Sequence, residues 1–144
     1  SDRYVITHRW APGDQVKVTF NFDIEKVSQP ASRTVKGQGV YLKRGPLVYA
    51  LPFEHKVKRS KEHRNSGFYR YRLSPKQKKA WNYTLNPNNP VEFVPAATGN
   101  LNSPWDEPVV HLNVWLKDNQ GTLKPFQLVP MGNTVFRRVT FSTH

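Results

Sequence analysis

The sequence predicts an all-β fold, an antiparallel β-sandwich of the jelly-roll or immunoglobulin-like type with about nine short strands and little helix. Apolar and polar residues alternate along much of the 144-residue chain. Twelve prolines and eight glycines divide it into short segments, which leaves little room for long helices. Aromatic residues make up 12% of the chain, whereas disordered chains are poor in them. The length suits a single domain over residues 1–144, and a closed barrel is the less favoured architecture.

The first expected element is a hairpin near the N-terminus. Residues 4–10 are rich in β-branched and aromatic side chains, Pro12-Gly13 interrupts them, and residues 15–22 alternate. One face of the second run carries four apolar side chains, Val16, Val18, Phe20 and Phe22. Because side chains alternate between the two faces of a strand, we expect this apolar face to be buried in the core.

A central strand is expected in the next part of the chain. Residues 40–44 form a short strand-like run, Gly45-Pro46 is a turn signal, and residues 47–51 are apolar at every position. A strand that is apolar on both faces is typical of the middle of a sheet.

The remaining strands are expected to follow in short pieces separated by polar turns. Residues 95–108 hold three prolines, which predicts a long loop. Two tryptophans, Trp10 and Trp115, are expected to pack in the core. The strand-like runs are residues 66–73, 78–85, 91–94, 109–116, 126–130 and 134–141.

Most of the positive charge lies in one stretch. The chain has 22 Lys and Arg against 10 Asp and Glu, a net charge of +12. Residues 55–79 carry ten of the basic side chains and a single acid, Glu62, so that this stretch contributes +9. Residues 55–65 have almost no apolar content, and we expect them to form a basic mobile loop.

Two interpretations of the basic stretch stay open. Lys and Arg beside aromatic residues are typical of anion contacts, with tyrosines stacking on bases or sugars. Lysine on an exposed strand edge also discourages aggregation without any ligand. No nucleic-acid motif accompanies the charge, so nucleic acid is not favoured as a partner. The candidate anion-binding residues are Lys56, Lys58, Arg59, Lys61, Arg64, Arg70 and Arg72.

Aromatic side chains near loops are candidates for sugar stacking, because the apolar face of a pyranose packs on such rings; core packing explains them equally well. These candidates are Trp81, Trp105, Tyr69 and Tyr71.

The sequence offers no set of catalytic residues, and we expect neither a metal nor another cofactor. The acids that lie close in sequence, Asp106-Glu107 and the pair Asp23 and Glu25, are more typical of solvated surface than of acid–base catalysis. Five histidines are scattered without metal-ligand spacing, and there is no cysteine. No apolar run is long enough to span a membrane, and the N-terminal residues hold no apolar signal region.

Four segments resemble, in order, the β-L-arabinofuranosidase-like proteins, which are glycoside hydrolase family 127 and its relatives. Residues 39–51 contain Arg-Gly-Pro-Leu-Val-Tyr, similar to the family's "R-G-P-L-V-Y" signature. Residues 9–18 resemble its "W-x-x-G-D-x-V" hairpin, and residues 80–85 resemble a "W-N-Y-x-L" segment of a bacterial subgroup. Residues 128–141 resemble the closing segment of those chains, with Leu, Pro, Gly, Thr, Arg and Phe in similar order.

The resemblance implies a β-sandwich region that follows a catalytic (α/α)6 barrel. The family's active site, with a Glu and zinc-bound cysteines, belongs to that barrel, so no catalytic residue carries over to this chain. The residues of the signature themselves suggest an architectural role: Gly45 permits a close approach or a positive φ, Pro46 fixes the start of the next strand, and Leu47-Val48-Tyr49 run through the core. The motif residues are Arg44, Gly45, Pro46 and Tyr49.

The expected function is therefore that of a non-catalytic accessory domain, excised from a larger bacterial glycoside hydrolase. Its partners would be the barrel of the same full-length chain and a plant or microbial polysaccharide. The parent enzyme would be periplasmic or extracellular. The alternatives are an independent carbohydrate-binding module and a binder of polyanions or nucleic acid through residues 55–79.

Overall fold

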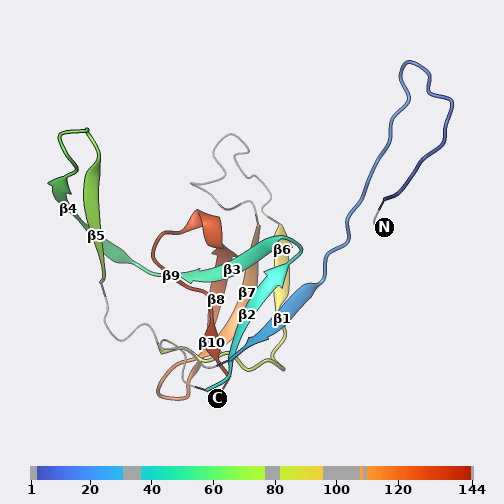
Figure 1. Cartoon of the computed structure of the whole chain (residues 1–144). Helices are drawn as coiled ribbons and strands as arrows, with labels where there is room; N and C mark the ends of the chain where they lie inside the picture. Colours follow the sequence, from blue (N-terminus) through green and yellow to red (C-terminus); the bar gives the residue numbers. More distant parts are fainter. Residues whose placement is uncertain (1–2, 31–36, 77–81, 96–107, 109, 144) are drawn as a thin grey trace.

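The computed structural model describes residues 3–30, 37–76, 82–95, 108 and 110–143 (Figure 1). It confirms the all-β fold, since the described elements are ten strands and one short 3-10 helix. The strands are β1 (Ile24–Gln29), β2 (Gly39–Arg44), β3 (Leu47–Pro52), β4 (His55–Glu62), β5 (Tyr69–Pro75), β6 (Glu92–Pro95), β7 (Val110–Lys117), β8 (Leu123–Pro130), β9 (Arg137–Arg138) and β10 (Phe141–Ser142); the helix η1 spans Met131–Asn133. Nothing helical in these ranges is long and apolar enough to cross a membrane.

Eight strands form one antiparallel sheet and two form a separate ribbon. The main path of the sheet is β1-β2-β3-β8-β7-β6, with β10 paired to β2 and β9 paired to β3. The strand β3 therefore has neighbours along both of its sides, as its two-sided apolar sequence predicts. The remaining strands, β4 and β5, pair only with each other and project from the body of the molecule (Figure 1).

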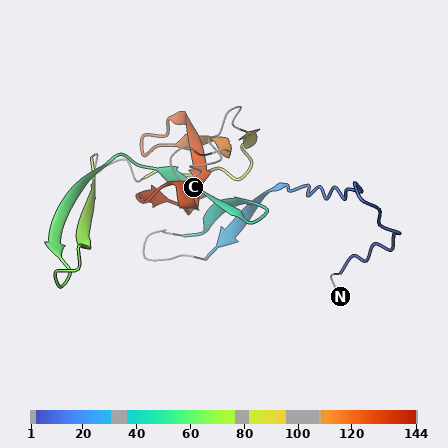
Figure 2. The same ribbon diagram turned by 90° about the horizontal axis from the view of Figure 1, so that it is seen from above.

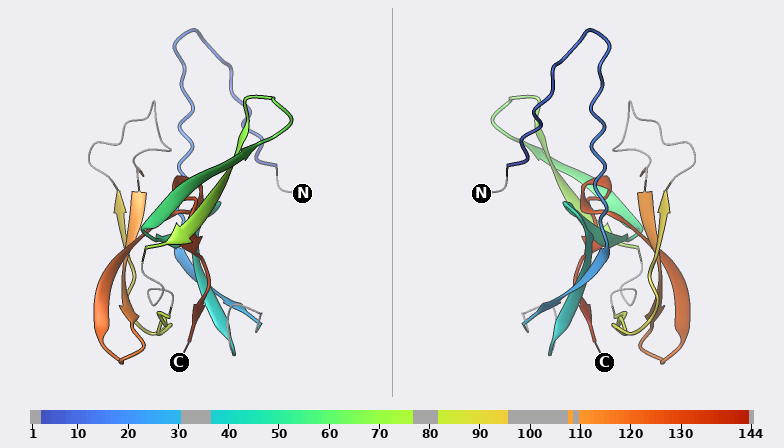
Figure 3. Two further views of the ribbon diagram at one scale, coloured as in Figure 1. Left: turned by 90° about the vertical axis from the view of Figure 1, so that its left-hand side faces the viewer. Right: turned by 90° about the vertical axis from the view of Figure 1, so that its right-hand side faces the viewer.

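The large sheet curls until its two halves face each other across the core, with β1 and β2 on one side and β7 and β8 on the other (Figures 2 and 3). In β7 the even-numbered residues point inward, so that Leu112, Val114 and Leu116 are buried. From the facing strands come Leu42, Tyr49 and Phe141, among other buried residues. The core is thus made by residues from sequentially distant strands.

The short segment Thr84-Leu85 links the end of β7 to β10. Thr84 forms an antiparallel bridge with Lys117, at the end of β7, and a parallel bridge with Ser142 of β10. The amide of Thr84 donates to the Lys117 carbonyl oxygen (2.9 Å), and the Lys117 amide donates back (3.0 Å). The next residue, Leu85, is fully buried. This segment joins strands that are not neighbours on the main path of the sheet.

The turn between β2 and β3 contains the Arg-Gly-Pro motif. Gly45 has φ +55°, a left-handed conformation that glycine adopts without steric cost. The guanidinium of Arg44 lies over the ring of Phe93, 3.8 Å from its centroid, which fixes β2 against β6. Tyr49 is fully buried, but Leu47 is partly exposed, so the expectation that the whole Leu47-Val48-Tyr49 run lies in the core is wrong at its first residue.

The expected N-terminal hairpin is wrong in its packing. Residues 3–23, which we call the N-terminal arm, leave the body as two extended segments joined by a turn (Figure 1). The turn at Pro12-Gly13 is present, with Gly13 at φ +99°. The two segments form no strand pair, and the apolar face expected in the core is exposed. Within the described chain no strand pairs with the arm, and the body meets its apolar face at Phe22, whose ring lies beside Gly45.

Four other expectations need correction. Residues 55–65 are expected to form a loop, but residues 55–62 form β4. The side chains of this strand are mostly exposed, and the strand forms because its backbone pairs with that of β5. Trp115 is 47% exposed because the odd-numbered positions of β7 face away from the core. Trp10 is 55% exposed because it lies on the arm. The run 134–141 yields only the short strand β9 and the first residue of β10.

Candidate functional site

The β4–β5 ribbon contains all seven candidate anion-binding residues or leads directly to them. Its register places Val57 opposite Leu73, Lys58 opposite Arg72, and Arg59 opposite Tyr71. The register shifts by one residue between Arg59 and Glu62, after which Glu62 lies opposite Tyr69. Because directly opposed residues share a face, this register separates the side chains of the ribbon into two groups.

One face is cationic. It carries Lys56 and Lys58 from β4 and Arg70 and Arg72 from β5, and all four side chains are exposed. Ser74, opposite Lys56, lies on the same face. No carboxylate of the described residues comes within ion-pair distance of these four cations. We call this surface the cationic face of the ribbon.

The opposite face is aromatic and apolar. The guanidinium of Arg59 lies 3.2 Å from the ring centroid of Tyr69, a cation–π contact. The carboxylate of Glu62 accepts a hydrogen bond from the Gly67 amide (2.6 Å) at the tip of the ribbon. The interactions of Arg59 with Tyr69 and of Glu62 with the Gly67 amide thus lie away from the cationic face.

The last two candidate anion-binding residues lie near the tip. Lys61 is exposed in the irregular part of β4, and Arg64 is in the turn with φ +50°. Neither shares the regular register of the cationic face. The structure therefore brings together four of the seven candidates and sets apart Arg59, Lys61 and Arg64.

Contacts at the base hold the ribbon to the sheet. The ring of His55 packs against that of Phe136 at 5.4 Å between centroids, and His55 Nδ1 donates to the Phe53 carbonyl oxygen (3.0 Å). The amide of Lys76 donates to the Glu54 carbonyl oxygen (3.0 Å), and the Lys76 ammonium pairs with the Glu54 carboxylate (3.2 Å). The projecting ribbon therefore has a fixed origin on β3.

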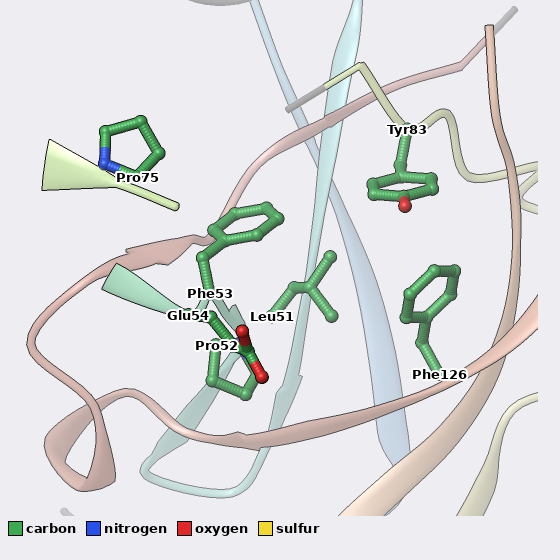
Figure 4. A pocket seen from close by; sticks show the side chains of 7 residues that line it. All are labelled: Leu51, Pro52, Phe53, Glu54, Pro75, Tyr83 and Phe126. Atoms are coloured by element: carbon green, nitrogen blue, oxygen red, sulfur yellow. The ribbon is translucent and has the colours of Figure 1, made fainter. Parts of the chain in front are cut away.

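A small pocket of about 190 Å³ lies beside this base (Figure 4). The rings of Tyr83 and Phe126 meet edge to face, 4.7 Å between centroids, and form one wall. Glu54 supplies the single carboxylate. That carboxylate is paired with the Lys76 ammonium, and the other lining side chains are apolar or aromatic, so the pocket suits a small apolar group. The lining residues are Leu51, Pro52, Phe53, Glu54, Pro75, Tyr83 and Phe126.

The structure only partly addresses the sugar-stacking candidates. Tyr69 is half-buried beneath Arg59, which occupies the ring face that a sugar would use. Tyr71 is 58% exposed and retains an accessible side chain. Trp81 and Trp105 lie outside the described residues, as do Asp106 and Glu107. Stacking on Tyr71 stays a prediction.

The described part of the chain brings no three His, Asp or Glu side chains together in a geometry that could hold a metal ion. Glu25, one of the candidate acids, pairs with Lys43 on the neighbouring strand (3.0 Å). Asp118 pairs with Lys124 (2.8 Å) and accepts hydrogen bonds from the amides of Gln120 and Thr122. The hydrogen bond from Lys124 is the main reason that the pKa of Asp118 lies below its usual value. Both pairs stabilise strands and turns.

Two features of the surface are not predicted by the sequence, namely the pocket and the exposed N-terminal arm. The pocket is built by residues from four separate segments of the chain, and the aromatic residues among them are the one local signal that could have indicated it. The exposure of the N-terminal arm has no local signal, since the same alternation is typical of a buried strand.

Comparison of the chain with protein-family models, with curated proteins and with solved structures finds no match.

Proposed function

We propose that this chain is a non-catalytic accessory β domain of a bacterial glycoside hydrolase that resembles the β-L-arabinofuranosidases, and that it packs on the catalytic barrel of the full-length enzyme. The four motifs in family order support the proposal. The exposed apolar side chains of the N-terminal arm are the observation that carries it.

The arm has the composition of an interface, and apart from the Phe22 ring, which lies beside Gly45, its large apolar side chains are at least half exposed. Its large apolar side chains are between 40% and 100% exposed. Apart from the turn, where the Asp14 amide donates to the Ala11 carbonyl oxygen (3.1 Å), no described backbone–backbone hydrogen bond holds it. Exposed apolar surface of this kind marks contact with another protein surface. The exposed side chains are Tyr4, Val5, Ile6, Trp10, Val16, Val18, Phe20 and Phe22.

The form of the arm also suits such a contact. An extended segment presents backbone donors and acceptors to a partner, together with a row of side chains on one face. Burying that row would contribute roughly 25 cal/mol for each Å² of apolar surface removed from water. A barrel in the same polypeptide would face the arm at high effective concentration, so that modest complementarity suffices.

A substitution in the arm tests the packing. We expect Phe20→Ser to lower the free energy of unfolding of the full-length enzyme by about 2 kcal/mol, because a buried ring is lost. The same change should leave the isolated chain unaffected, since Phe20 is 71% exposed there. Val135→Ser is the matched control, because Val135 is similarly exposed but lies outside the arm. Equal effects of Phe20→Ser on both proteins would contradict docking of the arm.

Activity measurements test the enzymatic part. The full-length protein should hydrolyse β-L-arabinofuranosides, and the isolated chain should not. Hydrolysis by the isolated chain would overturn the assignment of a non-catalytic role. A gene that encodes no helical barrel beside this domain would overturn the proposed parent enzyme.

A further inference from the structure

We propose that the cationic face of the β4–β5 ribbon binds an extended acidic polysaccharide of the polyuronate class. The bound groups would be the carboxylates of successive sugar residues. The charge and the geometry of the face argue for an extended polyanion by themselves. The choice of a polysaccharide as that polyanion rests on the proposed function.

The arrangement of charge on this face is unfavourable without a ligand. Lys58 and Arg72 are directly opposite each other, and Lys56 and Arg70 continue the two rows of positive charge. Like charges directly opposed across a strand pair destabilise it. The acid of the ribbon, Glu62, is engaged by the Gly67 amide on the other face and does not offset the repulsion. A bound polyanion would neutralise these charges and relieve the repulsion. The relief would make the free energy of binding more favourable.

The side chains also suit carboxylates. The planar guanidinium groups of Arg70 and Arg72 can each bind a carboxylate with two parallel hydrogen bonds. The ammonium groups of Lys56 and Lys58 act as point charges beside them. Same-face residues of one strand are about 6.7 Å apart, and opposed residues about 5 Å. Four cations at such intervals form a short strip along which an extended chain of anionic groups can lie.

The dimensions of the strip favour a single flexible chain over a nucleic-acid duplex. A module that recognises a duplex typically buries about 600 to 1,000 Å² and contacts phosphates over a broad surface. The positive surplus of this chain is concentrated in residues 55–79, since the other residues together contribute only +3.

Binding of the isolated chain to polygalacturonate tests the proposal, with neutral arabinan and duplex DNA as comparison ligands. We expect binding to polygalacturonate that weakens between about 50 and 200 mM salt, because counterions are displaced. The double variant Lys58→Gln/Arg72→Gln should bind at least about tenfold more weakly, the equivalent of losing one charge-assisted hydrogen bond. Circular dichroism would verify that the variant is folded.

The matched control is Lys17→Gln/Lys117→Gln, which removes the same charge from exposed positions outside the ribbon. It should bind polygalacturonate as the unaltered chain does. Equal loss in both variants would show that net charge, and not the face, is responsible, and would overturn the proposal. Tighter binding of duplex DNA than of polygalacturonate at the same salt would overturn it in favour of nucleic acid. Because these assays use no barrel and no catalysis, their failure is distinct from failure of the proposed function.

Discussion

Lys58 and Arg72 lie directly opposite each other on one face of the β4–β5 ribbon, two positive side chains paired across strands with no described carboxylate to separate them. On the opposite face, the Arg59 guanidinium lies over the Tyr69 ring, and the Glu62 carboxylate accepts a hydrogen bond from the Gly67 amide. Reversal of one charge in the opposed pair therefore isolates its contribution.

We expect Arg72→Glu to stabilise the ribbon by about 0.5 to 1 kcal/mol, because it converts a like-charge pair into an opposite-charge pair. Amide hydrogen exchange of β4 and β5 would measure this local effect. Arg72→Gln, which removes the charge without reversing it, should have an intermediate effect. Faster exchange in the Glu variant than in the unaltered chain would show that the opposed cations do not repel appreciably.

Gly45 lies against the point where the N-terminal arm joins the body, at Phe22. An alanine Cβ at this position would lie 2.7 Å from Cγ of the Phe22 ring, too close for both groups to stay. We expect Gly45→Ala to cost about 1 to 2 kcal/mol for the left-handed backbone, and more for displacing the ring. Urea unfolding would measure the total.

Gly67→Ala is the control for Gly45→Ala, because its φ is also positive (+77°) and nothing lies within 4 Å of the added methyl group. The difference between the two variants reports the collision with Phe22. Adding Phe22→Ala to Gly45→Ala should recover that difference. Equal costs for both glycine variants would mean that the ring moves aside freely.

Tyr49 is buried with a hydroxyl group that has no hydrogen-bond partner among the described residues. Burial raises the pKa of this phenol, with a smaller opposing influence from Arg44. An unpaired buried polar group lowers stability, so Tyr49→Phe should leave the free energy of unfolding unchanged or raise it by about 1 kcal/mol. Chemical denaturation would measure it. A loss of more than about 1 kcal/mol would indicate a hydrogen bond to that hydroxyl in solution.

Asp118 makes the β7–β8 turn sensitive to acid. Its pKa is lowered in the folded state, chiefly by the hydrogen bond from Lys124. The stabilisation it provides is therefore complete above the ordinary Asp pKa of about 4 and is lost as the pH falls through the lower folded value. Hydrogen exchange of the Gln120 and Thr122 amides, compared at neutral and strongly acidic pH, would follow this loss.

Asp118→Asn should flatten that pH dependence, because an amide can still accept from the backbone but does not titrate or pair with Lys124. An unchanged acid slope in this variant would assign the effect to another group. Glu25→Gln is a suitable comparison, since Glu25 pairs with Lys43 on a different pair of strands.

The sequence predicts the strands whose two faces are chemically distinct or uniformly apolar. β7 alternates and β3 is apolar throughout, and each lies inside the sheet. For residues 15–22 the same alternation predicts a buried face that the structure does not show. A local pattern indicates that one face is apolar, but it does not specify which surface covers that face. β4 is missed for the opposite reason: its residues are polar, and only pairing with β5 makes them a strand.

The cations of the candidate site are predictable from composition, but their grouping is not. Whether Lys58 and Arg59 serve one surface or two depends on the register of β4 against β5 and on the irregularity before Glu62. The pocket beside the ribbon is harder still, because Phe53, Tyr83 and Phe126 are far apart in sequence. Their proximity is a consequence of the curl of the sheet.

The bridge at Thr84 connects β7 to β10 across the curled sheet through very few hydrogen bonds. β7 and β8 pair along six residue pairs. By contrast, the contacts of Thr84 with Lys117 and Ser142 are isolated bridges of one residue each. Opening at this point breaks few hydrogen bonds, whereas separation of β7 from β8 breaks the whole ladder. Because Leu85, the residue after Thr84, is fully buried, we expect opening of this bridge to expose the core at a lower cost in hydrogen bonds than opening of the β7–β8 ladder.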